Sequence, residues 1–164
     1  MDWRDMVGDK LMSPQEAVSV ILPTDKVMVA PIIVTPFTLC KAVFERRHEL
    51  KGMYLDHFAP FFPWKEPGEK LMFELHDLYA TGADREMVNN AEVDYSPTGR
   101  WKEGEIPPGV VQEPDVFLVP VSAPDHRGYC SFGPGVFFSR RMCQTAKAVI
   151  AEVHENFIRT GGDN

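Results

Sequence analysis

The sequence of 164 residues has no long apolar run and no excess of basic side chains. Its longest apolar stretches, such as residues 116–121, are far shorter than the roughly 18 residues that a membrane-spanning helix needs. The 24 acidic residues outnumber the 17 basic ones and give a net charge of −7, which argues against binding to a nucleic-acid backbone. We therefore expect neither a membrane protein nor a nucleic-acid-binding protein.

Cysteine is also scarce. The three cysteines, Cys40, Cys130 and Cys143, are an odd number, and no two of them form a C-x-x-C pair. This pattern favours reduced thiols in a cytoplasmic protein over disulfides or a zinc site. The polar and acidic residues 1–5 do not resemble a secretory or transit signal. We expect a cytoplasmic protein that holds no metal ion.

The common nucleotide-binding and hydrolase motifs are absent. The sequence contains no G-x-x-x-x-G-K-[ST], G-x-G-x-x-G, G-x-S-x-G or H-E-x-x-H pattern. The triplet Gly133-Pro134-Gly135 is only a G-x-G, which is more typical of a tight turn than of a phosphate-binding loop. No permanently bound cofactor is expected.

What remains is the composition and patterning of one globular α/β domain over residues 1–164. Hydrophobic residues make up 44% of the chain and charged residues 25%, so the chain can bury a core. Strand-like and helix-like patterns alternate, which predicts an open, mainly parallel sheet with flanking helices. The expected strands are residues 27–30, 53–58, 71–80, 93–95, 116–121 and 149–153, and the expected helices are residues 14–22, 36–49, 84–90 and one that begins at 139 or 140; residues 99–114 are expected to form a loop.

Two helix starts carry capping signals. Ser13 precedes Pro14, and Glu16 lies at the position from which it completes a capping box. Asp84 is predicted to cap the helix that follows it.

Open parallel sheets bind ligands at the carboxyl ends of their strands. The segments that we expect there are residues 35–38, His57 and residues 129–135, so the sequence predicts a small-molecule site among them. His57 is either a part of that site or, as we favour, a hydrogen-bonded structural histidine. Cys130 is either a nucleophile or, as we favour, a buried small apolar side chain.

Three segments resemble one enzyme family. Residues 119–133, V-P-V-S-A-P-D-H-R-G-Y-C-S-F-G, resemble the S-P-P-D-x-x-G-Y-C-S-x-G stretch of family I coenzyme A transferases, in the acetyl-CoA hydrolase/transferase group that includes 4-hydroxybutyrate CoA-transferases. Residues 146–153 with Arg159-Thr160 resemble that group's A-K-x-V-I-A-E-V-N and P-R-T-x-G-D motifs. Residues 84–95 are similar to its T-R-x-A-V and G-x-A-D-Y segment, and the similarity extends in patches from about residue 13 to residue 163.

The resemblance implies an N-terminal-type domain of a coenzyme A transferase, with an acyl-CoA and a small carboxylate as substrates and coenzyme A as a substrate moiety. In this family the catalytic glutamate, the G-x-G-G oxyanion element and most coenzyme A contacts belong to a second domain, which these 164 residues do not include. We therefore assign no catalytic residue and expect a second transferase-like chain that carries the glutamate. The residues that the resemblance and the expected strand ends assign to substrate binding are Pro36, Phe37, Thr38, His57, Tyr129, Ser131 and Gly133.

Several functions are compatible with this resemblance. The first is a subunit of a split acyl-CoA transferase or hydrolase. The family's glycine-rich turn after the first strand is replaced here by residues 30–36, which contain no glycine, so the acyl pocket is expected to be reshaped and other acyl-CoA chemistry, such as decarboxylation or carbon–carbon cleavage, is an alternative. A non-catalytic ligand-binding or regulatory module, or a piece of a full-length transferase, are further alternatives. The aromatic residues 58–64 are expected to form either a partner interface or a local hydrophobic cluster.

Overall fold

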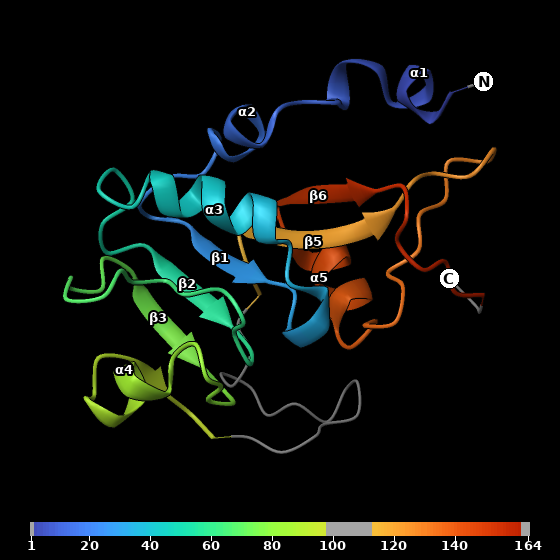
Figure 1. The fold of residues 1–164 in the computed structure, drawn as a ribbon. Helices are drawn as coiled ribbons and strands as arrows, with labels where there is room; N and C mark the ends of the chain where they lie inside the picture. Colours follow the sequence, from blue (N-terminus) through green and yellow to red (C-terminus); the bar gives the residue numbers. More distant parts are fainter. Residues whose placement is uncertain (1, 98–112, 162–164) are drawn as a thin grey trace.

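The two strands with the plainest apolar runs form the centre of the sheet. The structure is a computed structural model that describes residues 2–97 and 113–161, and the bounds of all elements refer to these residues. Strands β1 (Lys26–Val29) and β5 (Val116–Ser122) pair with each other and are almost entirely buried. The strand order is β4-β3-β2-β1-β5-β6, and each of the described pairings is parallel, which confirms the predicted α/β class (Figure 1). The other strands are β2 (Tyr54–His57), β3 (Glu74–Asp77), β4 (Asp94–Tyr95) and β6 (Ala148–His154).

Short helices flank the sheet. These are α1 (Trp3–Val7), α2 (Pro14–Val18), α3 (Phe37–Glu45), α4 (Arg85–Asn89) and α5 (Ser139–Thr145), with 3₁₀ turns η1 (Gly8–Lys10) and η2 (Ile32–Val34). None of the helices that the structure describes is long and apolar enough to cross a membrane.

Alternate residues of the central strands enter two separate cores. Val27 and Val29 of β1 face α3 and pack in the larger core, while Met28 faces α5 and packs in the smaller one with Met142. This alternation follows from the twofold period of a strand. Because both faces of β1 are buried, the residues from Val27 to Val29 are all apolar.

The structure corrects some predicted boundaries. Helix α2 ends at Val18 rather than at residue 22, and α3 ends at Glu45 rather than at residue 49. Strand β1 ends at Val29, because the chain turns through Pro31 into η2. Strand β3 has four residues, fewer than the predicted segment. The loop predicted for residues 99–114 lies outside the described residues except for its last two.

Of the two predicted caps, one is confirmed and one is wrong. The Ser13 hydroxyl accepts from the Glu16 amide at 3.2 Å, and the Glu16 carboxylate accepts from the Ser13 amide at 2.9 Å, which completes the capping box. Asp84 precedes α4 but makes no side-chain cap. Its carboxylate instead accepts from the amide of Thr81, at 2.7 Å, because the side chain is buried against the preceding loop.

Candidate functional site

The predicted site residues follow three neighbouring strands at one edge of the sheet. Because the sheet is parallel, β1, β2 and β5 all end at this carboxyl edge, where β1 leads into η2 and the start of α3, and β5 leads into a turn over residues 123–130. Pro36–Thr38, His57 and residues 129–133 all follow or end strands at this carboxyl edge.

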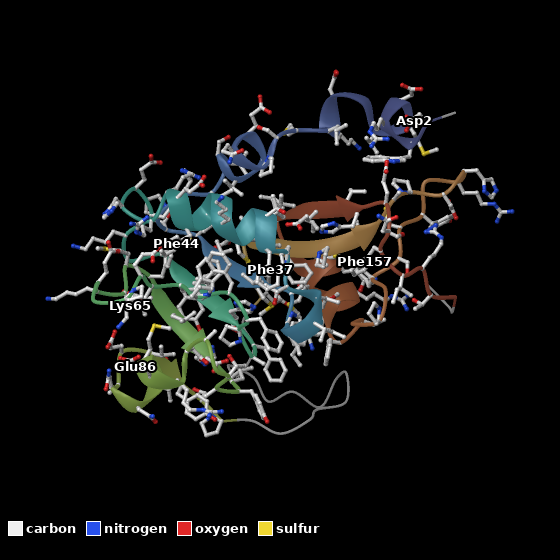
Figure 2. All side chains as sticks on the ribbon, viewed as in Figure 1. Asp2, Phe37, Phe44, Lys65, Glu86 and Phe157 are labelled. Carbon is white, nitrogen blue, oxygen red and sulfur yellow. The ribbon has the colours of Figure 1, made fainter. Side chains whose placement is uncertain are left out.

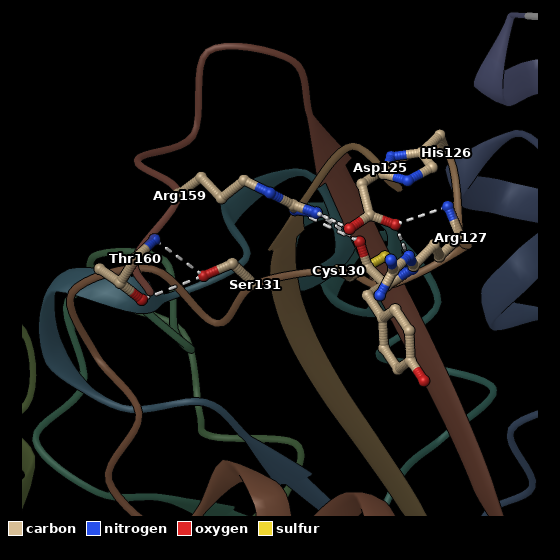
Figure 3. Close-up of a pocket in the computed structure, with 8 residues that line it drawn as sticks. Asp125, His126, Arg127, Cys130, Ser131, Arg159 and Thr160 are labelled. Atoms are coloured by element: carbon tan, nitrogen blue, oxygen red, sulfur yellow. Dashed lines mark hydrogen bonds and ion pairs between the residues drawn. The ribbon is translucent and has the colours of Figure 1, made fainter. Parts of the chain in front are cut away.

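A pocket of about 410 Å³ opens beside the end of β5 (Figure 3). Its walls come from the turn after β5 and from the segment after β6. The lining residues are Asp125, His126, Arg127, Tyr129, Cys130, Ser131, Arg159 and Thr160. A volume of this size and a lining of hydroxyl, guanidinium and imidazole groups suit a small anionic or polar ligand.

Asp125 fixes the conformation of the turn. Its Oδ1 accepts from the amides of Arg127 and Tyr129, at 2.9 and 3.0 Å, and its own amide donates to the Tyr129 carbonyl at 2.9 Å. These two backbone donors and the Arg159 guanidinium lower the pKa of the Asp125 carboxyl below its usual value. Asp125 is therefore ionised at neutral pH and acts as a structural acceptor.

Arg159 connects the turn to the segment after β6. Its guanidinium donates to the Tyr129 carbonyl at 2.6 and 3.2 Å and to the Ser122 hydroxyl at 2.9 Å, and it forms an ion pair with Asp125 at 3.2 Å. One planar cation thus holds three acceptors, which a lysine cannot do in the same geometry.

Ser131 organises the floor of the pocket. The amides of Gly133 and Thr160 both donate to its hydroxyl at 3.1 Å, and its own amide donates to the Ser122 hydroxyl at 2.9 Å. The Thr160 hydroxyl lies 3.1 Å from the Ser131 hydroxyl and donates to the Gly133 carbonyl at 3.2 Å. Ser131 and Gly133 are buried, whereas Tyr129 is exposed and faces the opening.

His57 lies behind the edge and not on its surface. The side chain is 0% exposed; its Nδ1 accepts from the Trp64 indole at 2.9 Å, and its Nε2 lies 3.4 Å from the Thr35 hydroxyl. The indole can only donate, so Nδ1 carries no proton and Nε2–H faces Thr35, which in turn donates to the Ile32 carbonyl at 2.7 Å. Burial lowers the pKa of His57 to about 3, so the ring is neutral and positions the turn after β1.

The remaining predicted residues lie at the start of α3. Pro36 is buried, whereas Phe37 and Thr38 are exposed. Phe37 and Phe44 both project from this helix (Figure 2), and the Phe62 ring contacts both, with centroid distances of 6.3 and 5.9 Å. The structure thus places the predicted residues in two groups at the carboxyl edge. Tyr129 and Ser131 line the pocket, and Gly133 donates to Ser131 behind it. The other predicted residues lie at and beneath the start of α3.

The interpretation of one residue changes, and two further residues join the pocket. Cys130 is exposed, so the prediction that it is a buried apolar side chain is wrong. Partial burial still raises the pKa of its thiol, which disfavours a nucleophilic role at neutral pH. Arg159 and Thr160 were not among the predicted site residues, although both line the pocket. The Arg-Thr pair of the family motif was the signal that could have identified them.

We expect the Arg159→Gln variant to loosen the pocket without unfolding the domain. The amide of glutamine cannot hold three acceptors, and Arg159 is partly exposed, so we expect a loss of about 1–2 kcal/mol in the free energy of unfolding. Hydrogen exchange of the Ser131 and Gly133 amides should become faster. The matched control is Arg127→Gln, a change of an exposed arginine on the same pocket, which should leave exchange unchanged; equal effects of both variants would contradict this role for Arg159.

The fold is an α/β domain with a parallel sheet, and the pocket lies at the carboxyl end of the sheet, where open parallel sheets bind ligands. Comparison with known proteins gives its relatives. The chain is 31% identical to the 4-hydroxybutyrate coenzyme A transferase of Clostridium kluyveri, over 100% of the chain and 39% of that protein. It is 25% identical to the butyryl-CoA:acetate CoA-transferase of Anaerostipes caccae, over 99% of the chain and 37% of that protein. No family model matches the chain.

Solved structures share the fold. RipA from Yersinia pestis superposes with a TM-score of 0.77 at 23% identity, over 99% of this chain and 41% of that one. The 4-hydroxybutyrate CoA-transferase from Porphyromonas gingivalis superposes with a TM-score of 0.64 at 23% identity, over 99% of this chain and 38% of that one. The resemblance noted in the sequence is confirmed: the chain is similar over its whole length to coenzyme A transferases, and the solved structures share its fold. It spans 27–39% of the length of the curated relatives that it matches.

Proposed function

We propose that the chain is one part of an acyl-CoA transferase or hydrolase, and that it acts only together with a second transferase-like chain or domain. In this proposal the chain provides the acyl or carboxylate side of the site, and the second part provides the catalytic glutamate and most coenzyme A contacts. The observation that carries the proposal is a set of exposed apolar side chains at the carboxyl edge.

We call this set the edge surface. Its members are large apolar side chains that are about half exposed or more and that follow the carboxyl ends of β1, β2, β3 and β5: Ile33, Phe37, Phe61, Tyr79, Val136 and Phe137. Contacts beneath the surface connect these loops. Phe58 contacts both Tyr79 and Phe138, with ring centroids at 6.4 Å in each pair.

An apolar surface of this kind favours a protein partner over open solvent, because aromatic side chains are enriched in interface cores. Two facts support a transferase-like partner. The loops that carry the surface follow the carboxyl ends of the parallel strands, where such sheets bind ligands. The chain also spans only 39% or less of the length of its curated relatives. A second domain seated there would close the pocket and exclude water from an acyl-CoA thioester.

The aromatic residues 58–64 serve both expected purposes in this proposal. Trp64 is buried and packs with Phe62 and Phe73, at centroid distances of 4.8 and 5.6 Å, as a local cluster would. Phe61 is exposed and belongs to the edge surface. The substrate would contact Tyr129, Ser131 and Gly133 on one side and Pro36, Phe37 and Thr38 on the other, while His57 supports the turn between them.

The turn after β1 favours an altered acyl group. Ile32 has a φ of +55°, a left-handed conformation that is unfavourable for a β-branched residue and easy for glycine. The turn has therefore kept a backbone conformation suited to glycine while it carries bulky side chains. This supports the alternative in which the same scaffold handles a different acyl-CoA, with decarboxylation or carbon–carbon cleavage among the possible reactions.

The test is the native mass of the chain purified from its own source, with every co-purifying chain identified. We expect a complex of fixed stoichiometry with a chain that carries a glutamate and a G-x-G-G turn, and acyl-CoA turnover by the complex but not by either part alone. The double variant Ile33→Ser/Tyr79→Ser should weaken assembly at least tenfold, whereas Leu22→Ser, an equally exposed site outside the edge surface, should not. A monomer or homodimer that binds a carboxylate without turnover would overturn the proposal in favour of a non-catalytic binding module. If this sequence proves to be part of one longer polypeptide, the partner is a domain of the same chain and not a second chain.

A further inference from the structure

Two carboxyl groups meet in the interior at the far end of the same sheet edge. Asp77 is the last residue of β3 and is 0% exposed, and Asp84, immediately before α4, is 1% exposed. Carboxyl groups are rarely buried to this extent unless they are paired with a cation. In the part of the chain that the structure describes, neither of them forms an ion pair.

One oxygen of each carboxyl group has hydrogen-bond donors. The Asp77 Oδ1 accepts from the amides of Ala59 and Tyr79, at 3.1 and 3.0 Å. The Asp84 Oδ1 accepts from the Thr81 amide at 2.7 Å and lies 3.3 Å from the Thr81 hydroxyl, which also contacts the Pro60 carbonyl. The pair therefore connects the loop after β2 with the loop between β3 and α4.

The second oxygen of each group has no donor. Among the described residues, the Oδ2 atoms of Asp77 and Asp84 are both buried and without a hydrogen-bond partner. The two side chains interact with each other, so two ionised groups would repel at close range in a site that excludes water. One proton placed between the free oxygens removes a charge and supplies the missing donor.

We propose that Asp77 and Asp84 share one proton between their Oδ2 atoms and thereby form a carboxyl clasp that holds the loops after β2 and β3 together. Asp77 carries the proton and donates it to the Asp84 Oδ2. Loss of the proton leaves two buried negative charges and opens the clasp. The proposal does not depend on the proposed function, because the chain by itself contains every group involved.

Burial, followed by the Asp84 carboxyl, raises the pKa of Asp77 to about 7, so the clasp loses its proton as the pH rises through neutrality. Other titratable groups lie on the elements next to the clasp. On β2, His57 is neutral throughout this range, and Asp56 pairs with His76 of β3 at 3.3 Å. Asp94 and Tyr95 lie on β4, and Arg85 is exposed on α4.

The sign of the pH dependence follows from proton linkage. The folded chain retains a proton on Asp77 between about pH 4 and pH 7, where the unfolded chain has lost it. The contribution of the clasp to stability is therefore present at low pH and is lost as the pH rises towards and past 7. Because Tyr79 and the loop that contains Phe58 are held by this clasp, its opening should loosen that side of the edge.

The test compares the full chain with its Asp84→Asn variant between pH 5 and pH 8.5. The amide of asparagine donates to the Asp77 Oδ2 without a shared proton, so the variant should keep the clasp closed at all these pH values. In the original chain, exchange of the Ala59 and Tyr79 amides, corrected for base catalysis, should accelerate at least tenfold across this range; in the variant it should stay flat. Histidines such as His76 titrate in both proteins and cancel in the comparison.

Asp5→Asn, a change of an exposed aspartate in α1, is the matched control and should behave like the original chain. Equal pH dependence in the original chain and in Asp84→Asn would overturn the proposal. If that variant does not fold, carboxyl ¹³C NMR of the original chain decides the question. One aspartate that titrates near pH 7 supports the clasp, and titration of every aspartate below pH 5 overturns it.

Discussion

The Gly133→Ala variant is expected to lose about 2–5 kcal/mol of its free energy of unfolding. Gly133 has a φ of +61°, and a Cβ atom there would lie 2.4 and 2.9 Å from two ring carbons of Phe157 and 3.0 Å from the Ile158 carbonyl oxygen. The strain of a left-handed backbone at alanine and the steric overlap of its Cβ with Phe157 therefore both reduce the stability of the variant. Phe157 cannot move freely, because it packs against the smaller core and stacks on His154.

The matched control is Gly52→Ala. Gly52 also has a positive φ, of +80°, but a Cβ atom there meets nothing within 4 Å, so this variant reports the backbone strain alone, about 1 kcal/mol. Chemical denaturation measures both variants. We further expect Gly133→Ala to accelerate exchange of the Thr160 amide, which Ser131 holds beside Gly133. Equal losses of unfolding free energy in the two variants would show that the Phe157 ring moves aside at no cost and that its close packing against Gly133 does not contribute to stability.

Acidification should destabilise the chain through His57. In the folded chain the pKa of His57 lies at about 3, well below its ordinary value of 6.5, so the unfolded chain binds a proton that the folded chain excludes. His57 makes its full contribution to the free energy of unfolding above about pH 6.5. As the pH falls towards 3, this contribution decreases by up to about 4–5 kcal/mol. The difference between the denaturation midpoints of the original chain and of a His57 variant, followed from pH 7 to pH 4, measures this loss.

The His57→Asn variant separates the histidine from other acid-sensitive groups. Its amide oxygen can accept from the Trp64 indole, so the variant should be less stable at pH 7 but should lose less stability on acidification. His48→Asn, at an exposed position, should retain the pH dependence of the original chain. Parallel pH profiles for the original chain and His57→Asn would contradict the exclusion of a proton from His57.

The two buried titrating sites act in opposite directions. Falling pH restores the Asp77–Asp84 clasp and weakens the surroundings of His57. Between pH 4 and pH 7 the net profile is therefore shallower than either contribution, and only single variants reveal the two parts.

The sheet was predictable because its signals are local. The run Val27–Ala30 is apolar on both faces, which only a strand between two layers of helices requires, and the structure buries each of these residues. The Ser13 capping box was predictable for the same reason, since all its atoms lie within four consecutive residues.

Features that depend on distant segments were not predictable. Cys130 precedes Ser131 in an extended segment, and Ser131 faces inward because it bonds to Ser122, so its neighbour faces outward. Asp84 resembles a helix cap, but a second carboxyl group from β3 and the Thr81 amide determine its orientation. Arg159 lies 30 residues after Tyr129 in the sequence, and only the path of the chain through β6 brings its guanidinium to the Tyr129 carbonyl. The Arg159 contacts come from tertiary structure, and the Asp84 and Ser131 contacts depend on how the chain turns between the partners, which the residue types alone do not determine.

The position of β1 between β2 and β5 has a consequence for the order in which the domain folds. Strands β1, β2 and β3 join through residues 30–53 and 58–73, whereas the pairing of β1 with β5 brings Lys26 to Asp115, which lies 89 residues away. Closing such a long loop is entropically unfavourable and slow compared with local pairing. A kinetic intermediate built from the first three strands would already contain His57 and the aromatic loop but would lack the turn that carries Asp125 and Ser131. We therefore expect the pocket to form in a late folding step, and a chain halted before that step would present exposed apolar side chains.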